Sequence, residues 1–221
     1  MKYKGLLYCC LTALLMACTT DAYDKGEGKY SYLKTELVEA HVGSDKNVDF
    51  VVTDEGERLM AEPPFTAKWI TTADTTYRAL LLYDCKTDGK AACLSFGRIN
   101  VLEPVVADSV KNGVKTDPVR YESSWVSTSR RYLNVAVYLV TGATDDSEML
   151  HRLGMVADTL TVWPDSTRTL RLRLYHDQQT IPQYYSQRTY FSVPLYDIDA
   201  DTVTLSVNTF DGIVERSFTV K

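Results

Sequence analysis

The sequence is poor in the residues that mark unfolded or fibrous chains. Among 221 residues it has only 11 glycines and 7 prolines, whereas aromatic residues make up 11% and include 15 tyrosines. Disordered and collagen-like chains are richer in glycine and proline and poorer in aromatic residues. We therefore expect one large folded domain or two small ones.

An excess of positive charge is also absent. Lys and Arg together number 24 against 29 Asp and Glu, and the formal net charge is -5 at pH 7. Nucleic-acid binding requires a concentrated cationic face that neutralises phosphates. We therefore expect no nucleic-acid partner and no simple adsorption to an anionic membrane surface.

Common catalytic and metal-binding signatures are missing as well. The sequence contains no G-x-S-x-G, H-E-x-x-H or C-x-x-C motif and no phosphate-binding loop. His151 and His176 suit hydrogen-bonded positions at strand ends, and the acidic run Asp197–Asp201 lacks the glycine and glutamate of a calcium loop. We therefore expect no enzyme activity, no metal site and no cofactor.

The amino terminus carries an export signal that ends in a cysteine. Two lysines precede an uncharged, leucine-rich run, Gly5–Cys18, whose length of about 14 residues is below the ~20 needed to span a bilayer. We expect residues 1–17 to be a signal peptide. Its last residues, Leu15-Met16-Ala17-Cys18, resemble a bacterial lipobox, in which the cysteine is lipidated and becomes the new amino terminus.

Lipidation of Cys18 predicts a membrane anchor in the cell envelope. More than one acyl chain makes such an anchor stable. The polar residues 18–32 show no apolar periodicity, so we expect them to form a flexible spacer.

Beyond the spacer, apolar residues alternate at period two, which is typical of β-strands. A hairpin is expected over Val48–Met60, and a second one pairs Ala79–Cys85 with Cys93–Leu102, where Gly97 indicates a bend or bulge. No segment shows the i, i+3, i+4, i+7 pattern of an amphipathic helix. The sequence therefore predicts an all-β fold.

The polar segment Asp108–Pro118 separates two halves of the chain. We expect a first domain over residues 33–108 and a second over residues 118–221. Short strands joined by polar turns in the second half are typical of a β-sandwich. In its closing hairpin, a two-residue loop at Asp211-Gly212 would pair Leu205 with Phe218.

Two cysteines, Cys85 and Cys93, flank a short turn. In an oxidising envelope such a pair can form a cross-strand disulfide, which contributes roughly 2–3 kcal/mol when the loop is short. The alternative is two reduced cysteines on neighbouring strands.

The candidate ligand surface is a group of three tyrosines among glutamine and arginine side chains: Tyr184, Tyr185 and Tyr190. Tyrosine stacks on sugar rings and also anchors protein interfaces. The alternative is that these rings pack inward at the end of the sandwich. Arg168, Arg171 and Arg173 form a basic stripe, which a charged outer strand face explains without a ligand.

Several short motifs are weak singly but specific in their order and spacing. They are the lipobox, Arg78–Tyr83, Ile99–Leu102, Asp117–Val119, Trp125, Tyr132–Val135, His151 and Leu172–Asp177. In this order they resemble the NigD-like lipoproteins of Bacteroidetes.

The resemblance implies an OB-like barrel followed by an antiparallel β-sandwich, on an outer-membrane lipoprotein that faces the periplasm or the surface. It implies a non-catalytic binding or scaffolding role toward a protein or glycan partner. Bacteriocin immunity is one alternative, and a glycan-binding or glycan-acting accessory protein is the alternative of a different class.

Overall fold

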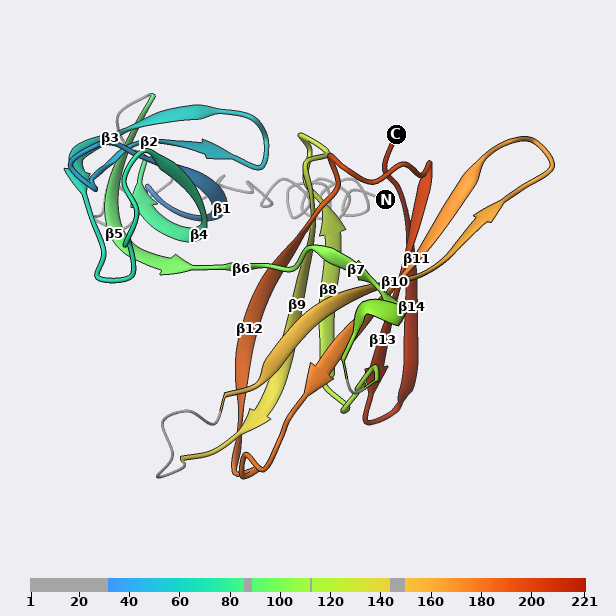
Figure 1. Cartoon of the computed structure of the whole chain (residues 1–221). Coiled ribbons are helices and arrows are strands. Elements are labelled where there is room, and N and C mark those ends of the chain that lie inside the picture. Colours follow the sequence, from blue (N-terminus) through green and yellow to red (C-terminus); the bar gives the residue numbers. More distant parts are fainter. Residues whose placement is uncertain (1–31, 86–88, 112, 144–149) are drawn as a thin grey trace, which may run out of the picture. The chain divides into compact units, whose positions relative to one another are not determined.

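The computed structural model describes residues 32–85, 89–111, 113–143 and 150–221. The elements in these ranges are β-strands, apart from the 3₁₀ turn η1 at Ala107–Ser109 (Figure 1). None of these elements is a helix long and apolar enough to cross a membrane. The all-β prediction is confirmed, whereas the signal segment and Cys18 lie outside the described residues.

The first five strands form a closed barrel. They are β1 (Leu33–Val42), β2 (Val48–Thr53), β3 (Arg58–Phe65), β4 (Thr75–Asp84) and β5 (Lys90–Arg98). They pair in the order β1-β2-β3-β5-β4, and β3 runs parallel to β5. Five strands closed in this way match an OB-like barrel.

The interruption in the β4–β5 pair is not at Gly97. That glycine pairs directly with Leu80, and the register shifts between Leu82 and Tyr83 instead, where Leu94 is the extra residue of β5. The exposed Leu94 is therefore the bulge residue, and the expectation for Gly97 is wrong.

The remaining strands form two packed sheets. They are β6 (Asn100–Val101), β7 (Pro104–Val106), β8 (Arg120–Val126), β9 (Tyr132–Thr141), β10 (Arg152–Val162), β11 (Arg168–Asp177), β12 (Tyr185–Pro194), β13 (Thr202–Thr209) and β14 (Gly212–Thr219). One sheet has the order β14-β13-β11-β10-β7 and the other β6-β12-β9-β8. Leu133 and Phe191 of one sheet and Leu172 and Leu205 of the other share one buried core, which confirms the sandwich.

The change from barrel to sandwich falls earlier than the polar segment Asp108–Pro118. β6 pairs with β12 at Phe191, and β7 pairs with β10 at Met155. Residues from Asn100 onward therefore belong to the sandwich sheets, because these two short strands complete the sheet edges.

The closing hairpin has a different register from the expected one. β13 and β14 pair Leu205 with Arg216 and not with Phe218. A two-residue loop of type I′ or II′ at Asp211-Gly212 needs positive φ at its first residue, Asp211, but positive φ occurs at Gly212 instead, at 111°. Because the pairing shifts by two residues, Leu205 keeps the core face and only its cross-strand neighbour changes.

Candidate functional site

A buried arginine connects the barrel strand β4 to the sandwich. Arg78 is 5% exposed, and its guanidinium lies 2.6 Å from Asp54 Oδ1 and donates to Asn134 Oδ1 at 3.0 Å. It also donates to Ser192 Oγ at 3.1 Å and lies 4.2 Å from the centre of the Tyr132 ring. A buried guanidinium is tolerated only when paired and hydrogen-bonded, as it is here.

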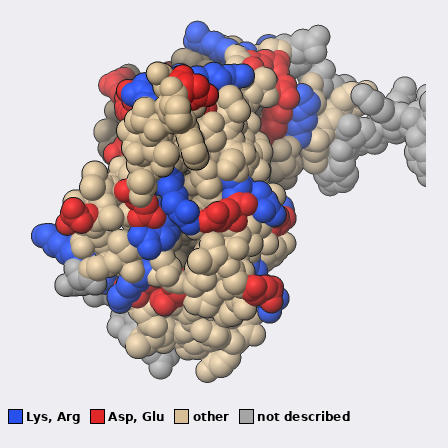
Figure 2. Space-filling model, turned by 90° about the vertical axis from the view of Figure 1, so that its right-hand side faces the viewer, with Lys and Arg blue, Asp and Glu red and all other residues tan. Residues whose placement is uncertain are grey.

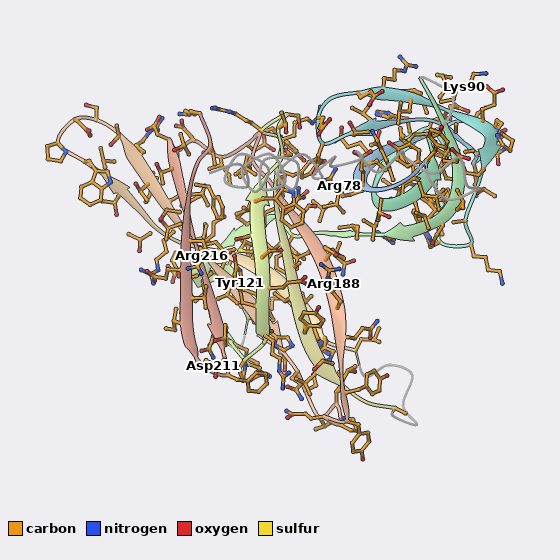
Figure 3. All side chains as sticks on the ribbon, turned by 180° about the vertical axis from the view of Figure 1, so that it is seen from behind. Arg78, Lys90, Tyr121, Arg188, Asp211 and Arg216 are labelled. Carbon is orange, nitrogen blue, oxygen red and sulfur yellow. The ribbon has the colours of Figure 1, made fainter. Side chains whose placement is uncertain are left out.

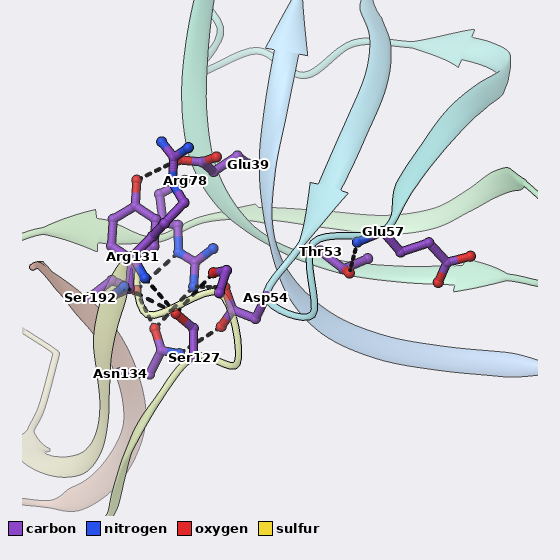
Figure 4. Close-up of polar contacts among 11 residues, drawn as sticks. Glu39, Thr53, Asp54, Glu57, Arg78, Ser127, Arg131, Asn134 and Ser192 are labelled. Atoms are coloured by element: carbon purple, nitrogen blue, oxygen red, sulfur yellow. Dashed lines mark hydrogen bonds and ion pairs between the residues drawn. The ribbon is translucent and has the colours of Figure 1, made fainter. Parts of the chain in front are cut away.

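Glu39 of β1 makes a second connection of the same kind. Its Oε1 accepts from Arg131 Nη2 at 2.9 Å and from the Tyr132 hydroxyl at 2.8 Å. Burial, with the bond to Glu39, raises the pKa of Tyr132 well above its usual range. The residues of the two connections are called the Arg78 cluster: Glu39, Asp54, Arg78, Arg131, Tyr132, Asn134 and Ser192 (Figure 4).

A hollow of about 620 Å³ opens beside Arg78. It is lined by residues 76–78 of β4, by residues 98–102 at the end of β5 and in β6, and by residues 151–153 at the start of β10. Arg98 and Arg152 are both exposed members of this lining. We call it the arginine hollow.

Two histidines touch at the wall of the arginine hollow. His176 Nδ1 lies 2.9 Å from the carbonyl oxygen of Asp117, so this nitrogen carries the proton and donates it. His176 Nε2 then accepts from His151 Nδ1, also 2.9 Å away. This leaves His151 Nε2 buried without a hydrogen-bond partner, and burial, followed by the neighbouring His176, lowers the pKa of His151.

No serine is hydrogen-bonded to either histidine within the described ranges. Asp177 does not contact His176 through its carboxylate, because its Oδ2 accepts from Lys115 Nζ at 2.9 Å. A Ser-His-Asp triad requires both of these contacts. The pair therefore has the geometry of a structural contact between β10, β11 and the segment at Asp117.

The β10–β11 hairpin extends outward from its sheet (Figure 1), and it carries exposed apolar side chains toward its tip. Leu160 is 49% exposed, Val162 63% and Trp163 51%. The Trp163 indole donates to Thr169 Oγ1 at 3.0 Å, which holds the ring in place. Asp165 steadies the turn by accepting from the Thr167 backbone N–H at 3.0 Å. Leu160 and Val162 lie on one face of the hairpin with Leu170, and Trp163 lies on the other face with Thr169. We call Leu160, Val162 and Trp163, which cover both faces near the tip, the hairpin surface.

A second hollow, of about 360 Å³, borders the hairpin surface. Leu160 and Leu170 line one side of it, and Tyr196 and Ile198 line the other. Of the carboxylates in its lining, Asp199 pairs with Arg168, whereas Glu103 and Asp197 have no ion pair among the described residues. An apolar centre with a polar rim is typical of a protein interaction surface.

The expected basic stripe on β11 is neutralised. Arg171 pairs with Glu215, and Arg173 pairs with Asp158 at 2.6 Å. On the side of the molecule drawn in Figure 2, blue and red side chains are interspersed, with uncharged surface between them. The stripe is therefore a solvent-exposed strand face, which is the explanation that requires no ligand.

The three tyrosines of the expected ligand surface do not converge. Tyr184 and Tyr185 are 78% and 56% exposed at the end of the sandwich. Tyr190 lies five residues along β12 from Tyr185, so the two side chains point to opposite faces of the sheet. The Tyr190 ring instead lies under Arg188, whose guanidinium carbon is 4.8 Å from the centre of that ring.

The two cysteines are not joined by a disulfide in the structure. Cys93 lies opposite Tyr83 in the β4–β5 register, so Cys85 is diagonal to it and not directly across. Diagonal residues are about 7–8 Å apart, beyond the roughly 4.4–6.8 Å between Cα atoms that a disulfide spans. The structure thus has the second of the two alternatives, half-buried cysteines on neighbouring strands without a disulfide between them.

Sequence reasoning missed the Arg78 cluster, the arginine hollow and the hairpin surface. An arginine within the apolar strand Arg78–Tyr83 is a signal for a buried ion pair. The large apolar residues that continue up to the Pro164 turn, Leu160, Val162 and Trp163, are a signal for the hairpin surface. Arg98 and Arg152 carry no such local signal, because only the fold brings them to one hollow.

These features define an all-β protein with an OB-like barrel followed by a β-sandwich. The family model described as the NigD-like C-terminal beta sandwich domain matches residues 102–220, and the chain belongs to this family. The resemblance noted from the motifs is thereby confirmed. The comparison with curated proteins gives no match.

Solved structures share the fold across most of the chain. A NigD-like immunity protein from Bacteroides caccae is 23% identical, with a TM-score of 0.64, and the match covers 85% of this chain and 97% of that one. A protein from Bacteroides fragilis, described provisionally as a lipoprotein, is 13% identical with a TM-score of 0.59 over 86% of this chain and 98% of that one. At these identities the likeness shows the fold alone.

Proposed function

We propose that the protein is a non-catalytic lipoprotein of the outer membrane that binds a protein partner through the hairpin surface. In this proposal residues 1–17 are removed, Cys18 is lipidated, and residues 18–32 tether the folded part. The lipobox supports the anchor, and the provisional description of the similar Bacteroides fragilis structure agrees with it.

The hairpin surface is the observation that carries the binding role. A tryptophan held by its own hydrogen bond loses little conformational freedom on binding, and tryptophan is enriched among the residues that dominate interface energies. Leu160 and Val162 are exposed on the opposite face of the hairpin from Trp163, and Leu160 also lines the 360 Å³ hollow. A partner that contacts the hairpin tip from both faces would cover all three side chains.

Immunity against an antibacterial protein is the second candidate. The similarity to a structure described as a NigD-like immunity protein favours it, and an immunity protein also needs a protein-binding surface. The scattered positions of Tyr184, Tyr185 and Tyr190 give less support to a glycan-binding role.

The test is site-specific photo-crosslinking of the full-length protein in living cells. A photo-reactive side chain at Val162 should give a crosslinked protein, which Trp163→Ala should weaken. The same side chain at the exposed Ser217 of β14 is the matched control. Absence of a crosslink at Val162, or equal crosslinking at Ser217, would contradict the proposal.

A further inference from the structure

The lining of the arginine hollow is unusual for this acidic chain. It contains Arg78, Arg98 and Arg152, and none of its residues is an aspartate or glutamate. The whole chain, in contrast, has more acidic than basic residues. The hollow therefore concentrates positively charged side chains, although the protein as a whole has a negative net charge.

Two of the three guanidinium groups have no ion-pair partner among the described residues. The charge of Arg78 is compensated by Asp54 at 2.6 Å. Arg98 forms no salt bridge, and neither does Arg152, whose strand neighbour Asp177 is already taken by Lys115 at 2.9 Å. Five other arginines have carboxylate partners, whereas Arg58, Arg120, Arg130 and Arg216 have none among the described residues. Arg98 and Arg152 therefore differ from these four in lining one hollow.

The fold holds the two unpaired arginines around one space. Arg98 ends β5, and the chain then continues through β6 and β7, where Pro104 pairs with Met155 of β10. This parallel path brings residues 98–102 alongside the start of β10, which carries Arg152. Behind them, the Arg78 cluster ties β4 to the sandwich, so the wall is formed before any ligand arrives.

A further wall of the hollow is also preorganised. The Tyr77 hydroxyl accepts from the backbone N–H groups of Thr71 at 3.3 Å and Thr72 at 3.0 Å, which holds the ring. The Arg98 guanidinium carbon lies 5.9 Å from the centre of that ring. Preorganised donors lose little freedom when a ligand binds.

We propose that the arginine hollow binds an oxyanion, the carboxylate, sulfate or phosphate group of a small ligand, through Arg98 and Arg152. The planar guanidinium fork matches the two oxygens of such groups. A volume of about 620 Å³ accommodates a small molecule, and Ile99, Leu102 and Leu153 provide apolar surface for its uncharged part. This site goes beyond the proposed protein-binding role and is separate from the hairpin surface.

The test is isothermal titration of the detergent-solubilised full-length protein with inorganic phosphate, inorganic sulfate and glucuronate in separate runs. At least one probe should bind saturably. Binding of glucuronate alone would indicate that the natural ligand carries a sugar carboxylate. Binding of phosphate or sulfate would indicate a phosphate ester or a sulfate ester. Arg98→Gln and Arg152→Gln should each weaken binding about tenfold or more, since each removes charge-assisted hydrogen bonds.

Matched variants separate the site from nonspecific charge effects. Arg216→Gln removes an exposed arginine that lies outside the lining, with its guanidinium carbon 5.5 Å from the Tyr121 ring centre (Figure 3), and should leave binding unchanged. Val162→Asp should leave it unchanged too, which keeps this test independent of the proposed function. Arg98→Lys keeps the charge but loses the fork and should bind with intermediate affinity.

Circular dichroism and thermal unfolding of each variant establish that it is folded. Two results would overturn the proposal: no saturable binding of any of the three probes, or folded Arg98→Gln and Arg152→Gln variants that bind as the unmodified protein does.

Discussion

At the scale of single residues, Arg78 makes polar contacts with three residues that are far from it in the sequence, Asp54, Asn134 and Ser192. Its partners come from the turn after β2 and from β9 and β12, so its removal leaves Asp54 without its cation, although Asn134 still donates to Asp54 and accepts from Ser192 Oγ. We expect Arg78→Ala to lower the free energy of unfolding by about 3–5 kcal/mol, as for other broken buried ion pairs. Urea unfolding measures this.

The control for Arg78→Ala is Arg98→Gln. Arg98 is exposed and forms no ion pair within the described part of the chain, so its loss should change the unfolding free energy by less than about 0.5 kcal/mol. Similar losses for both variants would show that the Arg78 cluster contributes nothing particular to stability.

The pKa of Tyr77 is shifted into a pH range in which the ionisation of a tyrosine can be measured in the folded protein. The backbone N–H of Thr72, followed by hydrogen bonding from the Thr71 side chain, stabilises the phenolate and lowers the pKa of Tyr77 to about 8 from 10.0. Because the folded pKa is the lower one, ionised Tyr77 adds stability that is full above pH about 10 and is lost as the pH falls through about 8.

Absorbance titration of tyrosinate checks this expectation. The folded protein should show one tyrosine that ionises near pH 8, and Tyr77→Phe should lack that step while keeping the later ones. A Tyr77→Phe curve identical to that of the unmodified protein would disprove the assignment.

At the scale of elements, the β13–β14 hairpin shows that a residue can lie on the expected face of a sheet although its cross-strand partner differs from the expected one. Leu205 is in the shared core although its partner is Arg216, whereas Thr204 on the other face bonds to Ser217 Oγ at 2.9 Å. Leu205→Ala should cost roughly 2–4 kcal/mol by leaving a cavity. Thr204→Ala should cost under about 1 kcal/mol, because it loses one exposed hydrogen bond.

Denaturant unfolding of both variants gives the comparison. Equal losses would mean that Leu205 is not a core residue, and a Leu205→Ala cost below that of Thr204→Ala would contradict the observed sheet.

At the scale of the whole molecule, the proposed anchor decides where the folded part can act. Cys18 is the only cysteine at the lipobox boundary, so Cys18→Ala should prevent incorporation of labelled fatty acid. Each acyl chain contributes ~0.8 kcal/mol per buried methylene, and without it the protein should leave the membrane fraction. Label at the unmodified level in Cys18→Ala would contradict the anchor.

The sequence by itself determined the all-β class, the hairpin over Val48–Met60 and the sandwich, because alternation of apolar residues depends only on neighbours within one strand. The face of Leu205 could be predicted for the same reason. Its cross-strand partner could not, since that depended on which residue of the turn adopts positive φ.

Only the tertiary structure decided which residues surround Arg78, Arg98 and Arg152. Arg78 and Ser192 are 114 positions apart, and Asp54 and Asn134 are 80 apart, so no local pattern relates them. Arg98 and Arg152 share a hollow because β7 pairs in parallel with β10. Pairing between distant strands brings such side chains together, and it follows from burial of the whole core rather than from the residues beside each arginine.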